Sequence, residues 1–274
     1  MLKPYFLKTL QGHVFIQSFV PEQPNGEAVI FVPPFAEEMN KSRRMMGLLG
    51  HSLAAKGVLM VIPDLYGTGD SEGGFSDARW SIWLDNVEQL VHKLKEQGIK
   101  TVSFTGLRMG CLLINDYISQ QKSAIKRVVF WKPVTSGKQM VNQFLRLRVA
   151  NSMMDGKKET IETLRGLLVG EGELEIAGYS LNADLIHTLD EKKISAGSFD
   201  SSINLYWFEV LASENQPMPM ASTKTIQNLV DRGVDVNVQQ FVGENFWANQ
   251  EIAEIPELIS VTSKVFCEAR ASGC

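Results

Sequence analysis

The chain has 274 residues, of which 44% are hydrophobic and 21% charged, and its formal net charge is −4. This composition is typical of a globular protein, and it lacks the basic footprint of nucleic-acid binding. No apolar run approaches the roughly 20 residues that span a bilayer, and the first ten residues lack the apolar core of a secretory signal. Cys111, Cys267 and Cys274 are sparse and odd in number, which favours a reducing compartment. We therefore expect a cytoplasmic protein that binds no nucleic acid and has no membrane span.

The first half of the chain alternates predicted strands with predicted helices. A hairpin is expected at 6–10 and 13–20, buried strands at 28–33, 58–63, 101–105 and 127–131, and helices at 42–56, 80–97 and after 111. Ser42 is the expected N-cap of the first helix, and Gly57 its terminator. Strands that are apolar throughout and alternate with helices indicate a mostly parallel sheet with helices on both faces.

The rhythm breaks after Pro133 and resumes near residue 204. Residues 136–200 contain no strong strand pattern but have helical stretches at 143–154 and 158–168. Beyond them, a strand is expected at 204–210, a helix at 222–232, a strand at 236–242 and a closing helix at 256–269. We therefore expect a core of residues 1–135 and 201–274, with residues 136–200 inserted as a helical cap over the carboxyl ends of the strands.

The segment Gly106-Leu-Arg108-Met-Gly110 has the frame of a nucleophile elbow, G-x-S-x-G, with arginine in place of serine. The predicted strand before it and helix after it are the context in which this motif has meaning. Arg108 stays protonated at ordinary pH and is no nucleophile. The amides of Met109 and Phe35 are candidates for an oxyanion-hole-like pair, although the prolines at 33 and 34 remove two other donors.

The rest of a catalytic triad is incomplete in this sequence. Glu209 and Glu214 lie near the place for a triad acid, and Asp64, which follows a buried strand, is a third possible acid or base. All four histidines, which are His13, His51, His92 and His187, precede residue 188, so the chain order Ser, acid, His cannot be met. Cys111 is expected to turn into the packing behind the elbow. The cysteines and histidines show no metal-ligand spacing, and no cofactor motif is present.

Arg108 is expected to project beneath the cap, where a partly buried guanidinium needs a partner. One alternative is an internal carboxylate. The candidates, all expected on loops at this end of the sheet, are Glu37, Glu38, Asp64, Glu209, Glu214 and Glu244. The other is a bound anion at the start of the following helix. For that case the predicted ligand-binding residues are Arg108, Glu37, Glu244 and Trp247.

With the elbow and the loop Asp64-Leu-Tyr-Gly-Thr-Gly-Asp-Ser71 in place, the chain resembles α/β-hydrolases over nearly its whole length. The stretch 33–45, Gly178-Tyr179 and Phe246-Trp247 resemble the second hydrolase-like family associated with the exosortase A system. This resemblance implies an α/β-hydrolase fold and a setting among exopolysaccharide and PEP-CTERM gene clusters.

Two functions follow as expectations. The first is a member without Ser-His-Asp activity that binds a small anionic, acyl or sugar-derived ligand, or a partner. The second is an ester or thioester hydrolase with a non-standard nucleophile. The sequence does not predict the oligomeric state.

Overall fold

The computed structural model describes residues 1–120, 125–154, 158–199 and 202–267. Eight strands form one sheet in the order β1-β2-β4-β3-β5-β6-β9-β10. Their bounds are β1 Tyr5–Lys8, β2 His13–Phe19, β3 Glu27–Val32, β4 Leu59–Pro63, β5 Thr101–Leu107, β6 Ile125–Trp131, β9 Asn204–Leu211 and β10 Val236–Val242. β2 pairs antiparallel with β1 and β4, and the remaining pairs are parallel. The predicted mostly parallel sheet is confirmed.

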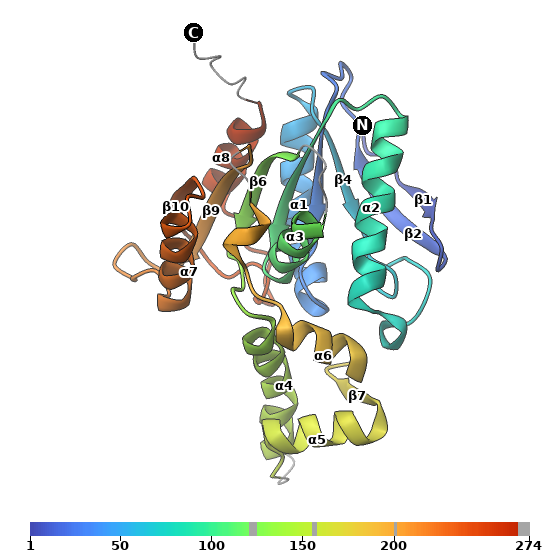
Figure 1. The fold of residues 1–274 in the computed structure, drawn as a ribbon, viewed down its shortest axis with the longest axis vertical. Coiled ribbons are helices and arrows are strands. Elements are labelled where there is room, and N and C mark those ends of the chain that lie inside the picture. Colours follow the sequence, from blue (N-terminus) through green and yellow to red (C-terminus); the bar gives the residue numbers. More distant parts are fainter. Residues whose placement is uncertain (121–124, 155–157, 200–201, 268–274) are drawn as a thin grey trace.

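Helices cover both faces of the sheet (Figure 1). One face carries α1 (Glu37–Ala54) and α8 (Pro256–Cys267); the other carries α2 (Trp80–Glu96), α3 (Met109–Gln120) and α7 (Met220–Asp231). The strand pleat divides the core between these two layers. In β3, Ala28, Ile30 and Val32 face the α2–α3 layer, while Val29 and Phe31 face the α1–α8 layer. Because β5 pairs parallel with both β3 and β6, the carboxyl ends of these three strands lie side by side at one edge of the sheet.

Helix α1 begins six residues earlier than the sequence predicted. Ser42 is not its N-cap but lies inside the helix, where its hydroxyl donates to the carbonyl of Glu38 at 2.7 Å. The helix begins after Ala36, and its first turn contains Glu37 and Glu38, whose charges suit the positive end of the helix dipole. The two carboxylates thus belong to the helix and not to a loop. Gly57, with φ of 82°, lies just past the end of the helix.

The inserted region contains α4 (Gly137–Met154), α5 (Ile161–Glu171) and α6 (Ala183–Glu191), all at the lower end of Figure 1. It also contains a hairpin of β7 (Glu173–Ile176) and β8 (Tyr179–Asn182), which the sequence pattern did not predict. Its turn, Ala177-Gly178, has positive φ at both residues, as a two-residue hairpin turn requires. Glu173–Ile176 alternates polar and apolar residues, but a run of four residues is too short to identify a strand.

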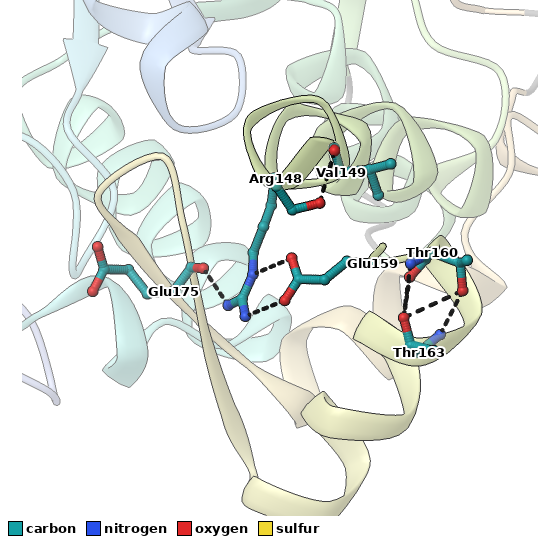
Figure 2. Close-up of polar contacts among 7 residues, drawn as sticks. Arg148, Val149, Glu159, Thr160, Thr163 and Glu175 are labelled. Atoms are coloured by element: carbon teal, nitrogen blue, oxygen red, sulfur yellow. Dashed lines mark hydrogen bonds and ion pairs between the residues drawn. The ribbon is translucent and has the colours of Figure 1, made fainter. Parts of the chain in front are cut away.

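One arginine joins three segments of this region (Figure 2). Arg148 on α4 makes a two-pronged ion pair with Glu159 at 2.8 and 3.1 Å and donates to the carbonyl of Glu175 on β7 at 3.1 Å. Beside it, Thr160 and Thr163 form the capping box that starts α5. These contacts hold α4, α5 and the hairpin in one unit.

The two ends of the insertion meet at an antiparallel bridge between Ser136 and Lys193. The amide of Gly137 donates to the carbonyl of Lys192 at 2.9 Å, and Ile194 donates to Thr135 at 3.3 Å. The predicted boundary at Asp200 lies outside the described residues, as does the end of the predicted closing helix at 269. We propose that the cap comprises residues 137–192.

Candidate functional site

The elbow segment forms a sharp turn between β5 and α3. Arg108 sits at its apex with φ of 53°, a left-handed conformation that is uncommon for a side chain of this size. A Cβ on Gly106 would lie 2.6 Å from the Ile114 side chain, and one on Gly110 would lie 2.2 Å from the backbone oxygen of Val32. Both glycines are therefore required by the close approach of α3 to β5 and β3.

Three residues with strained backbone conformations lie at the same edge of the sheet. Ala36 (φ 50°), Arg108 (φ 53°) and Lys132 (φ 42°) follow β3, β5 and β6, and in the described residues one other non-glycine, Ala177 in the hairpin turn, has positive φ. Strain of this kind costs about 1–3 kcal/mol per residue and clusters at functional sites. The three neighbouring strand ends therefore mark the candidate site.

The Arg108 side chain is held on three sides. Its Nε donates a hydrogen bond to Glu38 Oε1 at 3.0 Å, and its Nη2 donates one to Gln143 Oε1 at 3.3 Å. The guanidinium lies 5.7 Å from the ring centroid of Trp247. Arg108 is 14% exposed and Glu38 25% exposed. Burial raises the pKa of Glu38, and Arg108 opposes that rise. Of the carboxylates considered from sequence, Glu38 is the one paired with Arg108.

A cavity of about 200 Å³ opens beside this ion pair. Its lining is mostly apolar and comprises Phe35, Met140, Phe144, Leu147, Trp247 and Ala248, with Glu37, Glu38, Lys41, Arg108 and Gln143 as its polar members. Tyr179 donates to Glu37 at 3.0 Å, and burial together with this carboxylate raises the pKa of Tyr179 to about 12. Tyr179 therefore remains a hydrogen-bond donor at neutral pH. We call this space the apolar cavity.

The two amides expected to form an oxyanion-hole-like pair lie at the ends of adjacent strands. Phe35 follows β3, Met109 begins α3, and the register pairs Val32 of β3 with Gly106 of β5. Within the described part of the chain, neither amide donates a hydrogen bond. Both donors are thus available at the rim of the elbow.

Glu209 is not a free acid. It lies inside β9 and is fully buried, and its Oε1 is 2.6 Å from Lys132 Nζ, while its Oε2 accepts from the Trp207 indole at 3.1 Å. Lys132 Nζ also donates to the carbonyl of Val210 at 2.8 Å. A second buried ion pair therefore stands where a triad acid was expected.

The other predicted acids lie away from Arg108. Asp64 is buried beneath its own loop, where Oδ2 accepts from Arg43 at 2.8 Å and from the amide of Asp70 at 3.0 Å. Glu214 is exposed after β9, and Glu244 is exposed and accepts from Asn249 at 2.5 Å. None of these acids lines the apolar cavity. The structure therefore places Asp64 in loop architecture and gives Glu214 and Glu244 no contact with the site.

The family of serine aminopeptidases, S33, matches residues 23–195, which is more than half of the chain. The chain belongs to the serine aminopeptidase S33 family. No curated protein matches it in sequence. In the described residues, no helix is both long and apolar enough to cross a membrane, and no three His, Cys, Asp or Glu side chains gather as they would around a metal ion.

Solved structures place this S33 chain in the α/β-hydrolase fold. Est1E from Butyrivibrio proteoclasticus, with ferulic acid bound, is 15% identical, covers 96% of each chain and has a TM-score of 0.67. A putative hydrolase from Agrobacterium vitis S4 is 15% identical over 97% of each chain, with a TM-score of 0.66. A thermostable carboxyl esterase from Bacillus coagulans is 14% identical, covering 96% of this chain and 97% of its own, with a TM-score of 0.65. At these identities the likeness concerns the fold.

None of the four histidines of this S33 chain lies at the elbow. His13 pairs with Glu72, His51 packs on Phe19, His92 lies beside Glu96, and His187 is exposed on α6, while none of them lines the apolar cavity. Cys111 is fully buried, its thiol donates to the carbonyl of Gly106 at 3.1 Å, and burial raises its pKa well above the usual range. Among the described residues, no histidine or cysteine supplies a nucleophile or base at Arg108.

Sequence reasoning missed the contribution of the cap. Met140, Gln143, Phe144 and Leu147 all line the apolar cavity from α4. Their spacing of three, four and seven residues is that of one helix face, so the periodicity could have identified them. Lys132 was also missed, although it follows β6 as Arg108 follows β5.

Proposed function

We propose that this S33-family chain is a non-hydrolytic member that binds a small carboxylate with an acyl or aryl body in the apolar cavity. The observation that carries the proposal is the position of Arg108. It occupies the apex of the elbow, is anchored by Glu38, and forms the polar end of a cavity whose walls are mostly apolar.

The side chains around the elbow are unsuited to acyl transfer. A nucleophile at the apex must be deprotonated by a neighbouring base, and a guanidinium has neither nucleophilic nor basic character at ordinary pH. The half-buried Glu38 and the buried Glu209 are already paired, with Arg108 and Lys132. Losing triad members leaves only a residual acceleration of roughly 10³–10⁴ over water, which comes from binding and the oxyanion hole.

The cavity suits an amphiphilic acid. Phe35, Phe144 and Trp247 offer ring faces and edges to an acyl or aryl group. Glu38 and Gln143 occupy Nε and Nη2 of Arg108, so Nη1 has no partner in the described part of the chain. A carboxylate would accept a charge-assisted hydrogen bond from this nitrogen. Ferulic acid, present in the structure of the fold relative Est1E, is a suitable first probe.

Calorimetric titration tests this proposal. Ferulate and hexanoate are expected to bind the unmodified protein, and Arg108→Met is expected to weaken both at least tenfold, in line with about 1.4 kcal/mol per factor of ten. Hexanamide, which lacks the charge, is expected to bind the two proteins within a factor of three of each other. Arg146→Met, on the exposed side of α4, is the matched control and is expected to leave every affinity unchanged. Equal affinity of Arg108→Met and unmodified protein for hexanoate would refute the role of Arg108.

The biological setting that we propose is exopolysaccharide production in an exosortase A system, within the cytoplasm. This rests on the resemblance of residues 33–45, and it makes uronic acids and lipid-linked phosphates relevant anions. Glucuronate is therefore a third probe in the same titration. Binding of glucuronate in preference to hexanoate would favour a sugar-derived ligand over an acyl one.

An ester or thioester hydrolase with a non-standard nucleophile is the second candidate. The observation in its favour is the pair of amides of Phe35 and Met109, which have no recorded acceptor in the described residues and would suit an oxyanion. A bound ligand carboxylate could occupy the same donors without any reaction. Measured turnover separates the two candidates.

A further inference from the structure

A second, more polar cavity of about 180 Å³ lies across Arg108 from the apolar cavity. The two cavities share Arg108, Met140 and Gln143. The remaining lining of the second cavity comes from the end of β6, the start of the cap, β9 and the start of α7, and comprises Lys132, Pro133, Val134, Thr135, Ser136, Gln139, Glu209, Pro219, Ala221 and Ser222. We call this space the polar cavity.

Lys132 brings a charged donor to the polar cavity. Its Nζ lies 2.6 Å from Glu209 Oε1 in an ion pair and donates a hydrogen bond to the carbonyl of Val210 at 2.8 Å. The Oε1 of Gln143 accepts from Arg108, which leaves its amide protons as donors. Glu209 is the one carboxylate in the lining, and both of its oxygens are already paired, with Lys132 and with Trp207. The cavity therefore suits a ligand that is rich in acceptors.

The first turn of α7 faces the same cavity. The helix spans Met220–Asp231, and its N-cap, Pro219, has no side chain that could satisfy the first amides. In the described part of the chain, the amides of Ala221 and Ser222 have no recorded acceptor. Free amides at a helix N-terminus, together with the helix dipole, favour a bound anion.

Ser222 provides an independent observation. Its side chain lines the polar cavity, the residue is 4% exposed, and no hydrogen bond from its hydroxyl is recorded in the described residues. Little of the residue reaches water and no acceptor among the described residues takes its hydroxyl proton, so this proton can be donated to a ligand in the cavity. A ligand atom in the cavity would give it an acceptor.

We propose that the polar cavity binds a small oxyanion, a carboxylate or phosphate group, between Lys132 and the N-terminus of α7. Lys132 supplies an ammonium proton, Arg108 contributes from the wall shared with the apolar cavity, and Ser222 and the first amides of α7 complete the set of donors. The site shares Arg108 with the apolar cavity, but its occupation does not require that the apolar cavity bind an acid.

The test introduces a competing carboxylate by mutation. Ala221 is exposed and lines the polar cavity, so Ala221→Glu places a side-chain carboxylate at the helix N-terminus without disturbing the core. Met220→Glu is the matched control, because it adds the same charge to the same turn at an exposed residue outside the cavity lining. Both variants are expected to fold, since an acidic residue in the first turn of a helix is favourable.

Titration in Tris buffer with inorganic phosphate, and separately with acetate, gives the readout. Phosphate or acetate is expected to bind the unmodified protein, and Ala221→Glu is expected to weaken binding at least tenfold, while Met220→Glu changes it less than twofold. Ser222→Ala is expected to weaken it several-fold. Preference for one titrant identifies the oxyanion as phosphate or carboxylate. Absence of heat with both anions, or equal effects of Ala221→Glu and Met220→Glu, would overturn the proposal. Ala221 lines the polar cavity and not the apolar one, so Ala221→Glu tests this proposal without testing the first, and the two proposals fail independently.

Discussion

Replacing Lys132 with methionine is expected to lower the free energy of unfolding by about 3–5 kcal/mol, because it leaves Glu209 buried without its partner. Glu209 is 1% exposed and Lys132 17%, and the distance between Nζ and Oε1 is 2.6 Å. Methionine preserves most of the volume of the lysine stem, so the loss reports on charge and not on packing. Urea unfolding at neutral pH measures it.

The double variant Lys132→Met with Glu209→Gln provides the control. Removing both charges should recover most of the stability, because neither partner is left unpaired. Lys192→Met, which breaks a more exposed pair with Asp116, should cost about 1 kcal/mol or less. A loss in Lys132→Met no larger than that of Lys192→Met would show that the pair contributes little.

Gly110→Ala is expected to be the most damaging single methyl addition at the elbow. The new Cβ would lie 2.2 Å from the oxygen of Val32 and 2.9 Å from that of Pro33. Both are backbone atoms, so α3 must shift away from β3, at an expected cost of about 3 kcal/mol or more. Denaturant unfolding and the yield of folded protein measure the effect.

Gly47→Ala is the matched control for that variant. Gly47 lies within α1, and an added Cβ there would have nothing within 4 Å. Alanine has the higher helix propensity, so this variant should gain up to about 1 kcal/mol. Similar stability changes in the two variants would mean that α3 and β3 are not in close contact.

The sequence predicted the scaffold well because the scaffold depends on local patterns. Buried strands such as Val58–Pro63 are apolar runs bounded by turn residues, and the elbow is a glycine pattern between a strand and a helix. The hairpin of the cap escaped prediction because β7 and β8 each have four residues, and pairing across Ala177-Gly178 stabilises them more than their own pattern does.

The partners at the site could not be predicted because they depend on tertiary distance. Six carboxylates were reasonable partners for Arg108. Glu38 is the actual partner because α1 begins at Glu37, which places Glu38 in the first turn of the helix. A helix that began at Ser42 would instead leave Glu38 on a loop. The pair of Lys132 and Glu209 joins β6 to β9 across the cap insertion, and sequence spacing carries no sign of it.

Turnover of p-nitrophenyl acetate tests the central claim most directly, namely that Arg108 makes this elbow a binding site without a nucleophile. The unmodified protein is expected to release nitrophenol no faster than Arg108→Ala, and Arg108→Ser is expected to remain inactive because no base stands ready to deprotonate the hydroxyl. Robust turnover by the unmodified protein that disappears on substitution of Cys111 or His187 would contradict the account and identify a displaced nucleophile or base.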